Sequence, residues 1–219
     1  MRKFSIIAEI FCAIAMIVLA IIRVAMGDYA LAIDNMLFAI LASLFAVLFW
    51  KTAKNETLPY SPQVTAKELV NILRASKVTV ATAESCTGGL VAKSITDIPG
   101  ASEVFQYGMV TYSNEAKNKL LNVRAETLEE YTAVSEETAI EMARGAMNAS
   151  GAAIGVSVIG YAGGSAEGTD HNGLVWVAVV NARGYENAVA HHWKDCSRRK
   201  IREAALSVAL DMILEGATK

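Results

Sequence analysis

Residues 78–89 read VTVATAESCTGG, and this stretch decides how the rest of the chain is interpreted. Its first half is rich in β-branched residues, which is typical of a buried strand. Its second half ends in two glycines, followed by a run of small residues that fits a helix. A glycine-rich turn between a strand and a helix exposes backbone N–H groups, and the helix dipole favours negative charge there. Ser85, in this turn, is therefore a candidate for chemistry on an oxyanion or a phosphate.

Strand-like and helix-like segments alternate on both sides of this turn. Apolar and β-branched runs predict further strands at 104–112, 153–159, 174–180 and 188–193. Helical periodicity and capping residues predict helices at 64–76, 87–95, 114–121, 135–150 and 197–214. Alternating strands and helices indicate an α/β fold. We expect a layered α/β/α domain with a mixed sheet over residues 63–219.

The first fifty residues have a different composition. Residues 4–22 and 29–50 are almost entirely apolar, and about 20 such residues span the ~30 Å core of a bilayer. This predicts a two-helix transmembrane hairpin in residues 1–50, with membrane contact through residues 4–50. A polar linker follows at 51–62. Basic residues at both ends of the hairpin place the N-terminus and the catalytic domain in the cytoplasm. The alternatives are an oligomerisation element and a cleaved signal peptide.

Charge and cysteine content exclude several classes of function. The net charge is −2, with no basic stripe, so no nucleic-acid partner is expected. The three cysteines are widely spaced without a CxxC pair, which argues against a disulfide framework or a zinc site. The adjacent His191 and His192 point to opposite faces of a strand, so they are poor joint ligands. We expect neither a metal nor a cofactor.

Three residues could form a hydrolytic site without histidine. Ser85 is a weak nucleophile unless a base takes its proton. Lys117 could be that base if burial lowers its pKa towards neutrality, and Tyr112 could relay the proton or orient Ser85. Two alternatives remain open. Ser85 could simply cap the turn, and Cys86 is either a rival nucleophile or a small buried thiol.

Several blocks, in order along the chain, resemble the C-terminal domain of the CinA (competence/damage-inducible) family. They are TAESCTGG at 82–89, TDIPGAS at 96–102, YGMVTYSNEAK at 107–117, LNV at 121–123 and AVS at 133–135. The resemblance covers residues 64–216 and none of the apolar N-terminal segment. Active members of this family are nicotinamide mononucleotide deamidases. The resemblance also implies a homo-oligomer.

By this resemblance the chain is a nicotinamide-nucleotide amidase. It would hydrolyse the carboxamide of nicotinamide mononucleotide to nicotinic acid mononucleotide and ammonia by a serine–lysine mechanism. Ser85 matches the nucleophile, Lys117 the lysine beside it, and Tyr112 a tyrosine in the same site. Backbone N–H groups of the turn formed by residues 86–89 would stabilise the oxyanion of the acyl-transfer step. The candidate substrate-binding residues are Cys86, Thr87, Gly88, Gly89, Asn114, Gly163, Arg198 and Arg202, of which the two arginines are candidates for the phosphate.

The chain departs from the family pattern in one loop. Residues 159–166 read IGYAGGSA, where the family usually has a Ser/Thr-Gly-Ile-Ala-Gly-Pro-Gly-Gly type of loop. Ile159 therefore replaces a hydroxyl residue, and losing a hydrogen bond there could change the substrate or abolish turnover. The alternative function is a catalytically inactive, membrane-tethered protein of the same fold that binds a nucleotide or acts as a scaffold.

Overall fold

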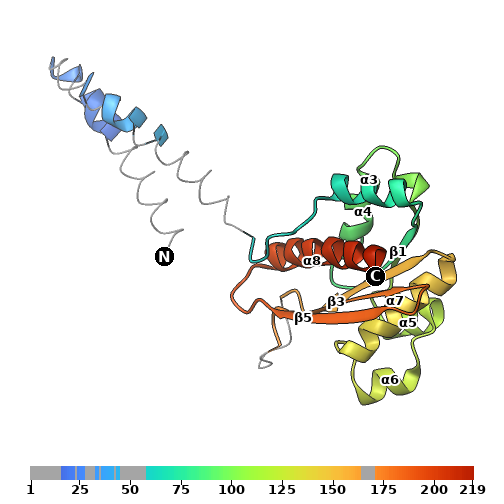
Figure 1. The fold of residues 1–219 in the computed structure, drawn as a ribbon. Coiled ribbons are helices and arrows are strands. Elements are labelled where there is room, and N and C mark those ends of the chain that lie inside the picture. Colours follow the sequence, from blue (N-terminus) through green and yellow to red (C-terminus); the bar gives the residue numbers. More distant parts are fainter. Residues whose placement is uncertain are drawn as a thin grey trace. The chain divides into compact units, whose positions relative to one another are not determined.

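The computed structural model describes residues 16–22, 24–27, 33–34, 36–41, 43–44, 58–163 and 171–219. The chain divides into two compact units, Met1–Thr57 and Leu58–Lys219 (Figure 1). Each unit has its own internal packing.

The membrane prediction is corrected by the first unit. Much of the predicted hairpin lies outside the described residues. Where the chain is described, none of its helices combines the length and the apolar character needed to cross a bilayer. The prediction of a membrane protein anchored through residues 4–50, with a cytoplasmic catalytic domain, is therefore wrong.

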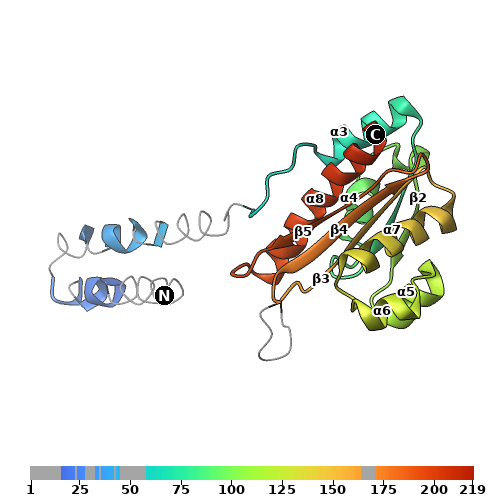
Figure 2. The same ribbon diagram turned by 60° about the horizontal axis from the view of Figure 1, so that its bottom comes forward.

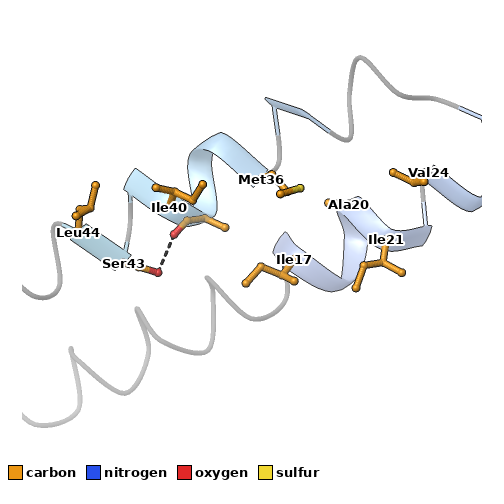
Figure 3. Close-up of a pocket in the computed structure, with 9 residues that line it drawn as sticks. Ile17, Ala20, Ile21, Val24, Met36, Ile40, Ser43 and Leu44 are labelled. Carbon is orange, nitrogen blue, oxygen red and sulfur yellow. Dashed lines mark hydrogen bonds between the residues drawn. The ribbon is translucent and has the colours of Figure 1, made fainter.

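The described side chains of the first unit are mostly apolar and exposed. Ala20 and Ala39 are buried, with 2% of their surface exposed. Around them, two helical segments line an apolar pocket of about 720 Å³ (Figure 3). Its one polar side chain, Ser43, donates a hydrogen bond from Oγ to the carbonyl oxygen of Ala39 at 2.8 Å. The lining is completed by Ile17, Ile21, Val24, Met36, Ile40 and Leu44.

The second unit is built on a five-stranded sheet in the order β2-β1-β3-β4-β5. Strand β1, the second in this order, is parallel to both its neighbours, whereas β3–β4 and β4–β5 are antiparallel. This confirms the predicted α/β class and the mixed sheet. The strands are β1 (Val80–Glu84), β2 (Phe105–Val110), β3 (Ile154–Gly160), β4 (Leu174–Asn181) and β5 (Glu186–His192).

Helices cover both faces of this sheet (Figures 1 and 2). On one face lie α3 (Ala66–Ser76), α4 (Leu90–Thr96) and α8 (Arg198–Thr218). On the other lie α5 (Asn114–Leu121), α6 (Ala125–Glu130) and α7 (Glu136–Ser150). A short 3-10 helix, η1 (Ala101–Glu103), precedes β2.

Strand β1 sends alternate side chains into the two helical layers. Val80 belongs to the apolar cluster that includes Leu69 of α3 and Ile201 of α8. Ala81 belongs to the cluster that includes Met142 of α7. This alternation is the period of two expected of a strand. The alternation therefore determines which helical layer the side chain of each residue at the end of β1 faces.

The start of α4 differs from the prediction. A helix was predicted from residue 87, but α4 begins at Leu90. Gly88 and Gly89 have φ angles of +60° and +90°, so they form a left-handed turn instead of helix. Residues other than glycine rarely adopt this backbone conformation. Because of the two glycines, the chain forms a turn after Ser85, and the helix begins only at Leu90.

Candidate active site

Ser85 lies at the carboxyl end of β1, between two neighbouring strands. Its N–H donates to the Val158 carbonyl at 2.9 Å, and the Thr111 N–H donates to the Glu84 carbonyl at 2.9 Å. The ladders to β2 and β3 therefore continue past the last residue of β1. Since Glu84 pairs with Val110 and Val158, Ser85 is flanked by Thr111 on one side and by Ile159 on the other.

Alternation along β1 places the Ser85 side chain on the face covered by α5 and α7. Ala83 packs in the cluster on that face, and Cys86 packs in the cluster on the opposite face. Ser85, between Glu84 and Cys86, shares the parity of Ala83. Its side chain is therefore directed towards the layer that contains Lys117 of α5. Ser85 is 8% exposed, so only a small part of its surface reaches solvent.

Lys117 is a fully buried lysine at the same end of the sheet. Its side chain is 1% exposed. Nζ donates to the carbonyl oxygens of Thr111 at 3.0 Å, Tyr112 at 3.2 Å and Ser113 at 3.5 Å. Burial lowers the pKa of Lys117 below its usual value of 10.5, while a thiolate at Cys86 would act in the opposite direction. Lys117 thus has one property required of a general base.

The predicted nucleophile and base are neighbours but are not hydrogen-bonded. Lys117 bonds the carbonyl of Thr111, and Thr111 is the residue beside Ser85 across the strand ladder. Within the described part of the chain, no hydrogen bond joins Ser85 Oγ to Lys117 Nζ. Catalytic hydrogen bonds are often long in structures without substrate. The arrangement is compatible with proton transfer once a substrate is bound.

Some N–H groups of the turn after Ser85 are already hydrogen-bonded to acceptors within the protein. The Gly88 N–H donates to the Ser85 carbonyl at 3.1 Å, and the Gly89 N–H donates to Glu84 Oε2 at 3.0 Å. Both groups are therefore unavailable to a substrate. Among the four residues predicted to supply an oxyanion site, Cys86 and Thr87 have the N–H groups that are still available.

Two arginines from the first turns of α8 reach this site. Arg202 Nη2 donates to the Thr87 carbonyl at 2.5 Å, and its Nε is buried without a hydrogen-bond partner. Arg198 Nη2 lies 3.4 Å from the Tyr112 hydroxyl, and its Nη1 lies 3.4 Å from the Gly163 carbonyl. Residues four apart share one face of a helix, which is why both guanidinium groups point the same way.

Cys86 is poorly suited to act as a nucleophile. Its side chain is 5% exposed and packs in the apolar cluster beneath α8. Burial raises the pKa of its thiol to about 12, although Arg198 and Arg202 act in the opposite direction. The thiolate is the reactive form of cysteine. The structure therefore favours the interpretation of Cys86 as a buried thiol.

The structure brings nearly all the predicted residues to one end of the sheet. Ser85, the turn that follows it, Lys117, Tyr112, Gly163 and both arginines are linked by the contacts above. Asn114 lies in the first turn of α5 with an exposed side chain that contacts none of them through a hydrogen bond. Within the described residues, no group of three potential ligands could hold a metal ion.

Two polar residues of the site were missed by the sequence analysis. Glu84 and Thr111 are 1% and 0% exposed. Thr111 Oγ1 is buried without a partner, next to the strand position of Ser85. Both residues directly adjoin predicted ones in sequence, at the carboxyl ends of parallel strands. That position is a signal that could have identified them.

Comparison with known proteins agrees with this fold. The family model of the CinA C-terminal domain matches residues 63–216. The chain belongs to this family. A solved structure, the competence/damage inducible protein CihA from Agrobacterium tumefaciens, superposes with a TM-score of 0.65 at 38% identity. The match covers 69% of this chain and 94% of that one.

Curated relatives differ in how much of their length is matched. A CinA-like protein from Kosmotoga olearia is 47% identical over 148 residues, which are 66% of this chain and 35% of that protein. The chain spans little more than a third of the first curated relatives it matches. The nicotinamide-nucleotide amidohydrolase PncC from Shigella flexneri is 44% identical over 152 residues, 68% of this chain and 90% of that protein. Homo-oligomerisation of the present chain stays a prediction.

Proposed function

We propose that this chain hydrolyses the carboxamide of nicotinamide mononucleotide to nicotinic acid mononucleotide and ammonia. The observation that carries the proposal is the buried Lys117, held by the Thr111 carbonyl at the strand position beside Ser85. A lysine with a lowered pKa next to a serine at a glycine-rich turn is the chemistry of a serine amidase without histidine. The similarity to a relative named as a nicotinamide-nucleotide amidohydrolase supports the choice of substrate.

In this proposal Ser85 Oγ attacks the amide carbon. The neutral amine of Lys117 accepts the hydroxyl proton, directly or through Tyr112, and the C–N bond then breaks. The leaving nitrogen takes up this proton and departs as ammonia, which leaves an ester between the substrate and Ser85. Water hydrolyses the ester, regenerating Ser85 and releasing the carboxylic acid. The N–H groups of Cys86 and Thr87 are the proposed donors to the oxyanion.

Arg198 and Arg202 are the proposed contacts of the phosphate. Guanidinium groups bind phosphate oxygens with charge-assisted hydrogen bonds. The buried, unpartnered Nε of Arg202 is a donor that such a ligand could satisfy. In this arrangement the two arginines bind the phosphate end of the substrate, and its amide lies next to Ser85.

Arg202→Gln is therefore expected to raise the KM for nicotinamide mononucleotide by roughly tenfold to a hundredfold, since a hydrogen bond to a charged group is lost. The KM for nicotinamide riboside, which lacks the phosphate, should change much less. Arg199→Gln is the matched control, because Arg199 makes an exposed ion pair with Glu203 at 3.2 Å. An equal rise in both KM values would argue against phosphate binding by Arg202.

The alternative is a protein of the same fold that binds a nucleotide without turnover, or acts as a scaffold. Ile159 favours this alternative, because it is buried beside the strand position of Ser85 with no hydroxyl to offer. An apolar neighbour cannot hydrogen-bond a polar substrate group, so it cannot stabilise the transition state of a polar reaction in this way.

Ammonia release distinguishes the two functions. The purified chain is incubated with nicotinamide mononucleotide, and ammonia and nicotinic acid mononucleotide are measured together. Equal amounts of the two products support the amidase. If neither product forms while calorimetry detects binding of the mononucleotide, the non-catalytic function holds instead.

A further inference from the structure

Glu84, the last residue of β1, has an unusual set of partners for a buried acid. Its carboxylate accepts three backbone N–H groups. Oε2 accepts from Gly89 at 3.0 Å and from Val91 at 3.1 Å, and Oε1 accepts from Ala92 at 2.8 Å. The side chain is 1% exposed, so these bonds are shielded from water.

The three donors belong to the start of α4. The first N–H groups of a helix have no partner within the helix, and a side chain at the N-cap usually satisfies them. Here the N-cap is Gly89, which has no side chain to do so. Glu84 takes over that function from the preceding strand, and its charge suits the positive end of the helix dipole.

This arrangement ties both ends of the turn together. Glu84 directly precedes Ser85, and the carboxylate of Glu84 bonds the residue that follows Gly88. The Gly88 N–H to Ser85 carbonyl bond closes the turn from inside. Only residues 85–88 lie between the two anchored points, so their backbone has little freedom.

We propose that Glu84 is a positioning residue, which fixes the Ser85 hydroxyl and the N–H groups of Cys86 and Thr87 in one geometry for attack on the amide. The proposal rests on the proposed function, in which Ser85 is the nucleophile. It has a second consequence. Because Glu84 occupies the N–H groups at the start of α4, the substrate phosphate is left to the two arginines of α8.

A matched control distinguishes positioning from simple stabilisation. Asp211 of α8 also accepts two backbone N–H groups, from Gln63 at 2.9 Å and from Val64 at 3.1 Å. It lies nine residues after Arg202, roughly 13 Å further along the helix. Asp211→Asn therefore weakens a comparable carboxylate–backbone contact away from the site.

The experiment compares Glu84→Gln with Asp211→Asn in the full chain. Ser85 is labelled with a fluorophosphonate, a reagent for nucleophilic serines, and the rate is followed by mass spectrometry. Ser85→Ala identifies the labelled position. Both amide variants should lose stability in urea unfolding. Only Glu84→Gln should slow the labelling, by roughly tenfold to a hundredfold, and lower kcat for the mononucleotide while KM changes less than about twofold.

Each outcome decides the proposal. Labelling of folded Glu84→Gln at the wild-type rate would reduce Glu84 to a helix cap and leave the proposed function untouched. Absence of labelling in the wild-type chain would instead remove Ser85 as the nucleophile, and the proposed mechanism with it. If Glu84→Gln does not fold, Glu84→Asp, which keeps the charge but is one methylene shorter, takes its place with the same readouts.

Discussion

Ser85→Ala is expected to lower kcat/KM for nicotinamide mononucleotide by a factor on the order of 10⁴ or more, because the acyl-enzyme can no longer form. Ser85 makes no side-chain hydrogen bond among the described residues, so its removal leaves no partner unsatisfied. The free energy of unfolding should therefore change by less than about 1 kcal/mol. Ammonia release and urea unfolding of the same preparation measure the two effects.

Cys86→Ala is the matched control for this experiment, because Cys86 is the adjacent nucleophilic residue. With the pKa of its thiol raised to about 12, Cys86 is almost entirely in the unreactive thiol form at pH 7. This variant should keep kcat/KM within about tenfold of the wild type, although the lost packing in the cluster beneath α8 lowers its stability. The reverse pattern, an active Ser85→Ala and an inactive Cys86→Ala, would reassign the nucleophile.

The pattern of the sequence predicts the secondary structure best where a cap and a buried face coincide. Helix α5 was predicted at its observed bounds, and Ser113 caps it by accepting from the Ala116 N–H. Ser135 likewise caps α7 through the Thr138 N–H. Helix α6 was missed because its six residues bury only Thr127, so no apolar periodicity marks it.

The candidate site was predictable in its parts but not in its connections. Glycines, a serine at a strand end and a lysine in a downstream helix can be recognised from the sequence. The contact of Arg202 with Thr87 joins residues 115 positions apart, and that of Arg198 with Tyr112 joins residues 86 apart. Such pairs arise only from the order of the strands and the packing of α8. No local pattern encodes them.

The sequence also does not predict which N–H groups of the turn are hydrogen-bonded within the protein. Four consecutive residues after Ser85 were predicted to supply N–H groups to an oxyanion. Two of these groups are used by the protein itself, one through the carboxylate of Glu84. Which donors remain depends on a side chain that folds back from the strand, and that direction follows from the three-dimensional structure alone.

Lys117→Met is expected to lower kcat by about 10²- to 10⁴-fold, the range typical of the loss of a general base. Methionine fills a similar volume but cannot accept the proton of Ser85. Lys119→Met is the matched control, because Lys119 lies in the same helix with an exposed side chain. A kcat of Lys117→Met close to that of the wild type would exclude Lys117 as the base.

The pH dependence provides an independent test of the same residue. Burial lowers the pKa of Lys117, and only the neutral amine can accept a proton, so kcat/KM of the wild type should rise with pH through this lowered pKa and then level off.

The stability of the folded chain should also depend on pH through the ionisation of Lys117. Between the lowered pKa and the usual value of 10.5, the unfolded chain binds a proton at Lys117 that the folded chain does not. The free energy of unfolding of the wild type, relative to that of Lys117→Met, should therefore increase with pH across this window, and should be independent of pH below it. Urea unfolding of both chains at a series of alkaline pH values measures this difference. A constant difference over the whole range would show that Lys117 titrates like an exposed lysine, and the serine–lysine mechanism would then lack its base at neutral pH.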